Sequence, residues 1–281
     1  MMLTQQKIQN NQTDKQISLN RDNYYDRTTD VLYQSPTFFK KFLSCEAETM
    51  AEINGEYKPS IDNKALLVGN YLHSYFESLE AHQQFIDEHK KEMFSKKKPF
   101  GLLSDYKKAD GMIDTLKNDS NFKKLYQGQK EVIVTGQIGG VNWKGRIDCL
   151  NLDKKIFLDL KTTRDIHMKC WINGERKPVS FVRAYNYQLQ MYVYQQLIYQ
   201  NFGVMCMPYI IAVSKQDVPD KLAISINNEQ LEEGASQIDE LQEHIEQVRQ
   251  GTIEPERCGH CEYCRSTAVL SDIVNMDDLI D

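Results

Sequence analysis

A hairpin spanning residues 145–161 restricts the fold of this chain more than any other stretch. Apolar and polar residues alternate along its second half, and a period of two is typical of a half-buried β-strand. If residues 153–154 form the turn, Asp148 lies opposite Asp159, and Lys161 lies on the same face as Asp159. Directly opposed residues have Cβ atoms about 5 Å apart, where two carboxylates repel each other unless a cation lies between them. The hairpin therefore outlines a metal site.

The ligand types in this hairpin suit a hard divalent cation. Paired carboxylates such as Asp148 and Asp159 favour Mg²⁺ or Mn²⁺, which keep several bound waters, and the backbone carbonyl of Leu160 is a further candidate ligand. Lys161 could orient or help deprotonate an attacking water and offset charge on a phosphate. The alternative is a surface hairpin whose exposed ion pairs are each worth less than about 1 kcal/mol. The spacing alone does not decide between the two.

Length and composition narrow the class of protein. The chain has 281 residues, enough for one large domain or two small ones. Since no apolar run is long enough for a membrane span and the N-terminus is polar, we expect a cytoplasmic protein. Seven cysteines, an odd number with three close together near the C-terminus, favour metal binding over a disulfide framework. The net charge of −6 does not itself suggest a nucleic-acid partner, but local lysine clusters could still bind phosphates.

Hydrophobic patterning predicts a mixed α/β (α+β) fold with a central mixed sheet flanked by helices. We expect a disordered lead-in at 1–20, one domain over 21–270 and an acidic tail at 271–281, which is either a disordered end or a peptide that docks onto a partner. The expected helices are one that begins at Pro36 with Ser35 as its cap, and others over 65–96, 104–118, 120–126, 185–200 and 228–250. The expected strands are 131–137, 141–150, 155–161, 205–213 and 222–226, with a loop over 162–180.

Four polar residues outside the hairpin could belong to a site. His73 lies on an apolar helical face, where a histidine is more often a core residue than a ligand. Gln188 and Tyr192 lie one helical turn apart and could contact substrate phosphates or position the lysine. An ordinary polar and aromatic helix face explains that pair equally well. Glu131, at the start of a strand, could equally be an edge-strand charge.

Taken together, these residues resemble the motifs of the PD-(D/E)XK nuclease superfamily over about residues 30–265. The likeness is to its RecB-like branch, and within that branch to phage and prophage exonucleases similar to the C-terminal nuclease domain of exonuclease VIII (RecE). The motifs are G-x-x-x-H at Gly69 and His73, G-x-x-D at Gly145 and Asp148, D-x-K at Asp159 and Lys161, and Q-x-x-x-Y at Gln188 and Tyr192. Each motif alone is weak, whereas four in this order are fairly specific.

The resemblance implies a restriction-endonuclease-like core and a role for each matching residue. His73, Asp148 and Asp159 would bind the metal together with the carbonyl of Leu160, and Lys161 would be catalytic. Gln188 and Tyr192 would contact the substrate, and Thr162 and Thr163 would meet DNA phosphates. Arg164, together with Lys169 and Arg183, is a further candidate phosphate contact because these residues flank the hairpin.

The resemblance also implies an activity. We expect a Mg²⁺- or Mn²⁺-dependent exodeoxyribonuclease that degrades double-stranded DNA ends from 5′ to 3′. The remaining 3′ strand would serve a phage single-strand annealing protein of the RecT type in recombination, and a ring-shaped homo-oligomer is expected. One alternative is a nuclease of the same fold that acts on flaps or single-stranded ends. Another, of a different class, is a non-catalytic DNA-binding protein stapled by a metal.

The cysteines form a second candidate site. Cys258, Cys261 and Cys264 follow a C-x₂-C-x₂-C spacing, and three thiolates need a fourth ligand. His260 points poorly for this role, and Cys45 is the better candidate. In RecB-like nucleases of the AddB type, one early and three late cysteines hold a [4Fe–4S] cluster, so the resemblance implies a similar staple with iron–sulfur or Zn²⁺. The late spacing here is tighter than in that type, and a metal-free loop is the alternative.

Overall fold

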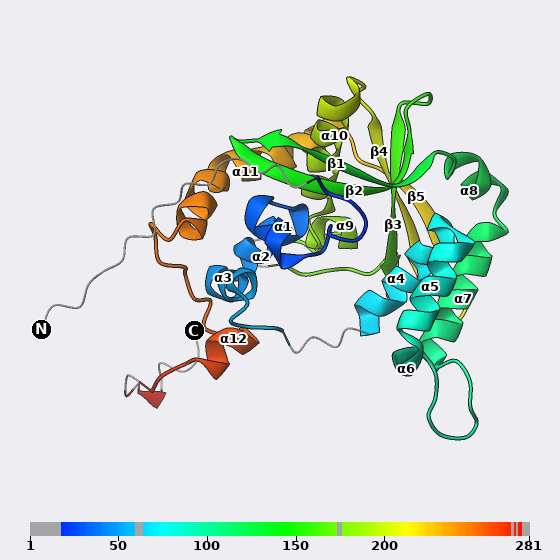
Figure 1. Cartoon of the computed structure of the whole chain (residues 1–281), viewed down its shortest axis with the longest axis horizontal. Helices are drawn as coiled ribbons and strands as arrows, with labels where there is room; N and C mark the ends of the chain where they lie inside the picture. Colours follow the sequence, from blue (N-terminus) through cyan, green and yellow to red (C-terminus); the bar gives the residue numbers. More distant parts are fainter. Residues whose placement is uncertain (1–17, 60–63, 173–175, 271–272, 274, 277–281) are drawn as a thin grey trace, which may run out of the picture.

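A five-stranded mixed sheet forms the centre of the protein (Figure 1). The computed structural model describes residues 18–59, 64–172, 176–270, 273 and 275–276. The strands follow the order β1-β2-β3-β4-β5, in which β3 and β4 are parallel and the other neighbours antiparallel. Their bounds are β1 Gln129–Ile138, β2 Val141–Asn151, β3 Ile156–Thr163, β4 Met207–Ser214 and β5 Lys221–Ser225. The predicted mixed sheet is confirmed.

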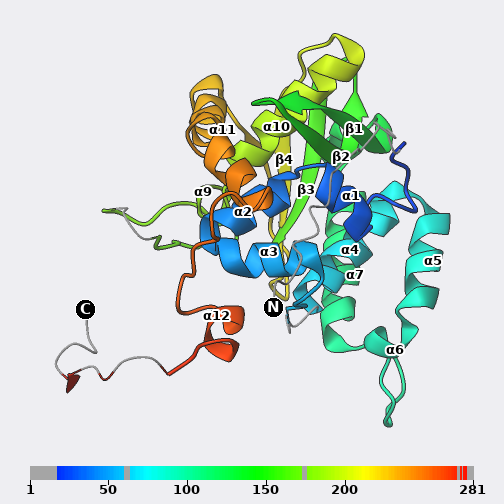
Figure 2. The same ribbon diagram turned by 60° about the vertical axis from the view of Figure 1, so that its left-hand side comes forward.

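Helices cover both faces of the sheet (Figure 2). On one side lie α2, α10 and α11, whose apolar residues share a core with Trp143 and Phe157. On the other side α4, α7 and α8 pack on Leu158 and Leu160. The helices on the first side are α1 Arg27–Leu32, α2 Pro36–Ser44, α3 Glu46–Asn54, α9 Phe181–Ala184, α10 Tyr187–Phe202 and α11 Asn228–Arg249. The helices on the second side are α4 Lys64–Glu77, α5 Leu79–Glu88, α6 Lys90–Met93, α7 Ser104–Lys117 and α8 Ser120–Leu125. The last helix, α12, is Glu262–Ser266.

The structure confirms most of the predicted elements and corrects one. The side chain of Ser35 accepts a hydrogen bond from the backbone N–H of Phe38, so it caps α2 as expected. The single helix predicted over 65–96 is instead three helices. The break comes at Ser78, whose extended backbone and side-chain bond from the N–H of Ala81 start α5 as a separate helix. A local cap therefore overrides the apolar periodicity that continues past residue 78.

The hairpin between β2 and β3 has the predicted register over a short ladder. Cys149 pairs with Leu158, and the ladder extends from there toward the turn. Asp148 and Asp159 lie one position beyond its last pair. On the other edge, Lys130 pairs with Cys149 and Val132 with Ile147, which places Glu131 across from Asp148. Three acidic residues therefore lie at one level on three adjacent strands.

Parts of three predictions lie outside the described residues, among them residues 173–175 of the loop expected over 162–180. Of the lead-in, the structure describes only 18–20, and of the acidic tail only 273 and 275–276. Within the described part of the chain, no helix combines the length and the apolar character needed to cross a membrane.

Candidate active site

A cleft of about 460 Å³ opens beside the end of the β2–β3 ladder. Side chains from several elements meet there. The cleft is lined by Tyr24 and Tyr25 near the N-terminus, Gly69 and His73 of α4, Arg146 and Asp148 of β2, Asp159, Leu160, Lys161 and Thr162 at β3, and Tyr187, Gln190 and Tyr194 of α10, among others. The structure thus brings together His73, Asp148, Asp159 and Lys161, all of which the sequence motifs had singled out.

Asp148 is buried and held by groups from two elements. Its Oδ1 lies 3.3 Å from His73 Nδ1, and its Oδ2 accepts a 2.6 Å hydrogen bond from the backbone N–H of Leu160. Burial alone would raise the pKa of Asp148, but the His73 ring, the Lys161 ammonium and this N–H lower it below its ordinary value. Burial would likewise lower the pKa of His73, yet the Asp148 carboxylate raises it. Asp148 is therefore an anion that attracts a positive charge.

Asp159 and Lys161 form an ion pair inside the cleft. The Lys161 Nζ lies 2.7 Å from Asp159 Oδ2, and Gln190 of α10 donates to Asp159 Oδ1 at 3.0 Å. Burial raises the pKa of Asp159 in spite of Lys161. For Lys161, burial opposes the charged form, but the Asp159 carboxylate outweighs it and raises the pKa. Lys161 therefore stays protonated throughout the neutral range.

Glu131 completes the acidic group and was left open by the sequence. Its carboxylate lies with His73 and Asp148 in a set of candidate ligand atoms that are all within 4.8 Å of one another. Burial, followed by repulsion from Asp148, raises the pKa of Glu131 to about 7. Its φ of 53° is unusual for a strand residue other than glycine, and such strain persists only where the surrounding structure enforces it. The Arg146 Nε atom lies 2.7 Å from Glu131 Oε2 and offsets part of its charge.

These groups fit a divalent metal. Two carboxylate oxygens among the described residues, Glu131 Oε2 and Asp159 Oδ2, are buried without a well-aligned hydrogen bond, although a cation lies close to each. A buried acceptor without such a bond is costly unless another group fills its lone pair. One imidazole and several carboxylate oxygens form a donor set suited to Mg²⁺ or Mn²⁺. The Leu160 carbonyl stays a predicted ligand.

The helix residues nearest the carboxylates are not the predicted ones. Gln190 and Tyr194 line the cleft, and they have the same Q-x-x-x-Y spacing as Gln188 and Tyr192. Two residues along a helix rotate a side chain by about 200°, so the two pairs point to opposite sides. Gln188 lines a neighbouring cavity, while Tyr192 packs partly buried against the core on the side of Asp239 in α11. The cleft is thus lined by Gln190 and Tyr194, and a substrate contact of Gln188 or Tyr192 stays a prediction.

The residues after the D-x-K motif separate in the same way. Thr162 lines the cleft, whereas Thr163 is buried and its hydroxyl donates to the backbone carbonyl of Asp165. Thr163 is thus turned away from the cleft, because adjacent strand residues face opposite sides. Arg164 is exposed just beyond β3, and Arg183 pairs with Glu233 at 2.8 Å.

Lys40 of α2 extends the site and was not singled out from the sequence. Its Nζ lies 3.5 Å from Gln190 Oε1 and 3.3 Å from the carbonyl of Tyr185, beside a cavity of about 900 Å³ that shares Tyr187 with the cleft. Burial and then the charge of Lys161 lower the pKa of Lys40 to about 8. A cationic side chain therefore links the cleft to the next cavity.

The four predicted cysteines also meet, at a place separate from the cleft. Cys45 lies between α2 and α3, and its sulfur is within 4.8 Å of those of Cys258, Cys261 and Cys264. None of the four lines the carboxylate cleft.

Comparison with known proteins identifies the family that shares this architecture. The model of the family described as "PDDEXK-like domain of unknown function (DUF3799)" matches residues 35–267. The crystal structure of a protein named "Putative exonuclease", from Eubacterium rectale, has a TM-score of 0.87 and 31% sequence identity, and covers 94% of this chain and 98% of its own. The structure of SSO0001 is 17% identical, covers 81% of this chain and 91% of its own, and at a TM-score of 0.29 carries no argument.

No curated protein matches the chain. The family match covers most of the chain and includes every residue of the cleft from Ser35 to Tyr194. The predicted PD-(D/E)XK core is thereby confirmed, and the chain belongs to the PDDEXK-like family DUF3799.

Proposed function

We propose that this protein is a metal-dependent DNA exonuclease that degrades linear double-stranded ends from 5′ to 3′. The resulting 3′ single strand would enter phage-type homologous recombination. Two findings support a nuclease: the membership in a PDDEXK-like family, and the likeness to a protein named "Putative exonuclease" at 31% identity over nearly the whole chain. The polarity of digestion and the recombination role follow from the resemblance to exonuclease VIII and are the parts to be tested.

One observation carries the proposal. His73, Asp148, Asp159 and Lys161 line one cleft, and the Glu131 carboxylate lies beside it, within 4.8 Å of ligand atoms of His73 and Asp148. Each of these five side chains is held by a partner from another strand or helix or by its neighbour in the D-x-K motif. A surface hairpin with exposed ion pairs would leave these acids in water. Instead Glu131, Asp148 and Asp159 are 5%, 7% and 2% exposed. Burial of three carboxylates is costly and calls for compensating positive charge.

The residues divide the work of phosphodiester hydrolysis between them. His73, Glu131 and Asp148, with Asp159 beside them, would hold Mg²⁺ or Mn²⁺, which when bound supplies Lewis acidity and lowers the pKa of a coordinated water. Lys161 is held protonated by Asp159, so it donates a hydrogen bond to a phosphate oxygen or orients the water rather than removing its proton. Gln190 fixes Asp159, and Lys40 in turn contacts Gln190.

DNA ends, a single-strand annealing protein and further copies of this chain are the proposed partners. Near the cleft, the side chains suited to phosphates and bases include Tyr25 and Arg146, whose ring centroid and guanidinium lie 4.9 Å apart. Thr162 adds a hydroxyl at the cleft wall. These groups would contact backbone and bases without a pattern that reads sequence, as expected for a nuclease that acts on any end.

The test is a comparison of substrates in the presence of Mg²⁺. Linear duplex labelled at the 5′ end, the same single strand, a 5′ flap and a closed circle are incubated with the protein, and the products are sized. We expect early release of the 5′ label from linear duplex and an intact circle. Cutting of the circle would exclude an exonuclease, and preference for the flap or the single strand would favour the same-fold alternative.

The alternative of another class is a non-catalytic DNA-binding protein. It predicts a DNA complex that forms without any Mg²⁺-dependent cleavage. Retention of the buried ion pair between Asp159 and Lys161 argues against it, because a protein that only binds DNA gains nothing from burying these charges. Intact linear duplex after prolonged incubation with Mg²⁺ and with Mn²⁺ would decide for this alternative.

A further inference from the structure

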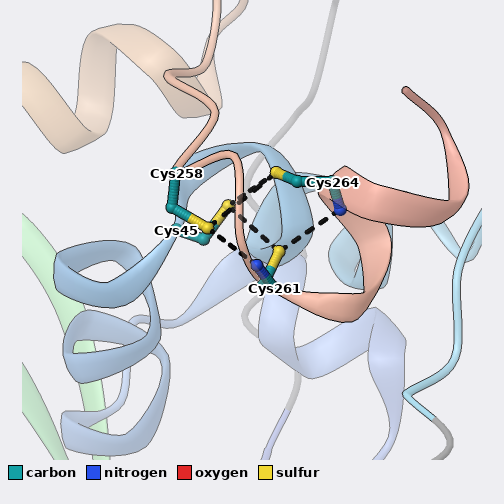
Figure 3. Close-up of side chains that lie close together, drawn as sticks. All are labelled: Cys45, Cys258, Cys261 and Cys264. Carbon is teal, nitrogen blue, oxygen red and sulfur yellow. Dashed lines mark hydrogen bonds between the residues drawn. The ribbon is translucent and has the colours of Figure 1, made fainter. Parts of the chain in front are cut away.

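Four cysteine sulfurs converge where the two ends of the domain meet (Figure 3). Cys45 follows the last residue of α2 and caps α3. Cys258 lies in the segment after α11, Cys261 caps α12, and Cys264 lies within α12. The Sγ atoms of Cys45 and Cys264 are 3.6 Å apart, those of Cys261 and Cys45 3.7 Å, and those of Cys258 and Cys264 4.0 Å. All four are free thiols.

The spacing of the sulfurs distinguishes the groups that four thiolates can hold. A tetrahedral zinc ion with Zn–S bonds of about 2.3 Å keeps its sulfurs about 3.8 Å apart. In a [4Fe–4S] cluster each sulfur binds a different iron of the cube, which spreads the sulfurs to about 6 Å. Here the three closest contacts lie between 3.6 and 4.0 Å, and all four sulfurs are within 4.8 Å of one another. The four sulfurs of Cys45, Cys258, Cys261 and Cys264, here called the cysteine cage, are spaced for a single ion and lie too close together for the cube.

Backbone N–H donors and buried neighbours surround the sulfurs of the cage. Backbone N–H groups point at three sulfurs: Glu48 at Cys45, Cys261 at Cys258, and Cys264 at Cys261, at donor–sulfur distances of 3.5, 3.3 and 3.3 Å. Amide donors stabilise a thiolate more than a thiol. Cys45 and Cys264 are buried at 4% and 2% exposure. Buried thiolates held this close repel one another unless a cation lies between them.

Apolar packing alone gives this region little stability. Its core consists of the buried residues Cys45, Ala47 and Cys264, against which Tyr263 and the other two cysteines pack. A core this small cannot offset the entropy of ordering a terminal segment, and small units of this kind usually need a metal or a disulfide.

We propose that Cys45, Cys258, Cys261 and Cys264 bind one Zn²⁺ in a tetrahedral structural site, and that they do not hold a [4Fe–4S] cluster. The ion binds as each thiol gives up its proton, so binding is coupled to proton release and to folding of the C-terminal segment. This zinc site is separate from the proposed nuclease centre and takes no part in cleavage.

The site's position suggests what the zinc stabilises. The backbone N–H of Ala47 donates to the carbonyl of Glu256, and the N–H of Glu256 donates to Glu46 Oε2, so the segment after α11 is tied to the start of α3. The helix that ends at Cys45 also carries Lys40, which contacts Gln190 near the carboxylates. Zinc at the cysteines therefore holds both the C-terminal segment and the wall of the cleft that α2 provides.

Metal analysis of the whole protein tests this inference. The protein is purified anaerobically without chelators, and zinc, iron and acid-labile sulfide are measured, with native mass spectrometry to count the bound atoms. We expect one zinc per chain, no sulfide and a colourless solution. A brown protein containing iron and sulfide, iron alone in place of zinc, or a chain free of metal would each overturn the proposal.

Substitutions confirm which residues hold the ion. Cys258→Ser, at a half-buried position, and Cys264→Ser should each lower the bound zinc more than tenfold, whereas Cys206→Ser, a buried cysteine outside the cage, should keep it. If the variants do not fold, titration of the wild-type protein with a thiol-binding mercurial should release the zinc. Zinc that remains bound after all accessible thiols have reacted would contradict the assignment. The result does not depend on whether the protein cleaves DNA.

Discussion

The carboxylate cleft and the cysteine cage differ in how the protein offsets the charge of their metal-ligating side chains. At the carboxylates, each acid already has a nitrogen partner from a protein side chain: Arg146 for Glu131, His73 for Asp148 and Lys161 for Asp159. In the cage, the donors that the described residues direct at the sulfurs of Cys45, Cys258 and Cys261 are backbone N–H groups, and Arg257 donates to the carbonyl of Cys264 rather than to its sulfur. The cleft can therefore form before its metal arrives, whereas the cage depends on its metal to form.

The two regions also differ in what supports them. Asp148 and Asp159 are fixed by the register of a central sheet with a core on each face. The cage rests on a cluster of three buried residues at the edge of the molecule. Loss of a cleft residue should therefore change activity more than stability, and loss of a cage residue should change stability more than activity.

The largest effect is expected for Lys161→Ala. Removal of the ammonium that offsets charge on the phosphate should lower the rate of DNA cleavage by about 10³-fold or more. Because Lys161 also neutralises Asp159, the thermal midpoint should be followed beside the rate. Lys154→Ala, an exposed lysine in the turn of the same hairpin, is the matched control and should leave both unchanged. Full activity of Lys161→Ala would show that Lys161 has no role in cleavage.

The second prediction concerns Glu131→Gln. Loss of this carboxylate should weaken Mg²⁺ by about 10–100-fold, measured as the Mg²⁺ concentration that gives half-maximal cleavage. In metal-free buffer the variant should be at least as stable as the wild type, because a buried carboxyl with a raised pKa is replaced by a neutral amide. Lower stability without metal would show that Glu131 serves the fold rather than the metal. Glu80→Gln, at an exposed position, controls for the change in net charge.

The third prediction separates the two Gln and Tyr pairs of α10. Gln190→Ala should lower the cleavage rate about tenfold, because Asp159 loses its amide donor. Tyr192→Phe should have little effect on the cleavage rate. Tyr194→Phe should lower that rate, because Tyr194 is a side chain of the cleft wall. Equal loss of activity from Gln188→Ala and Gln190→Ala would return the originally predicted pair to consideration.

The smallest effect is a pH dependence of DNA binding. The pKa of Lys40 is lowered to about 8, so its charge is present below pH 8 and is lost as pH rises through that value. Affinity for duplex DNA, measured with Ca²⁺ in place of Mg²⁺ to suppress cleavage, should fall above pH 8 by at most about tenfold per unit. Lys40→Arg should flatten this fall, because arginine stays charged. An identical pH profile in the two proteins would exclude Lys40 as a phosphate contact.

Stability should respond to Lys40 with the opposite sign. The unfolded chain keeps this lysine protonated to about pH 10, so between pH 8 and 10 the unfolded state binds more protons and the contribution of Lys40 to stability rises with pH. Denaturation midpoints of the wild type and Lys40→Met over this interval measure the difference.

The sequence predicts the hairpin well because strand alternation and a short turn determine its register. The same logic would have found Glu131: a turn at Gly139 and Gly140, between the strands predicted over 131–137 and 141–150, places it across from Asp148. The pairing within α10 could not be found in this way. That helix has three Gln and Tyr pairs with the same spacing, which begin at Gln188, Gln190 and Gln195. It is buried nearly all round, so no polar face distinguishes Gln188 from Gln190.

The contribution of Lys40 and the size of the cysteine cage depend on contacts distant in sequence. Lys40 meets Gln190 across 150 residues, and Cys45 meets Cys264 across 219. Local periodicity contains no information about such distances. Counting cysteines was enough to expect a metal, but the sulfur separations were needed to choose between one ion and a cluster.

The most direct measurement is digestion of end-labelled linear duplex over a range of Mg²⁺ concentrations, with the wild type and Asp159→Asn compared at verified equal folding and zinc content. We predict that the wild type releases the label only when Mg²⁺ is present and that Asp159→Asn releases none above background. Intact duplex at every Mg²⁺ concentration, or release by Asp159→Asn at the wild-type rate, would contradict the assignment of the cleft as a nuclease centre.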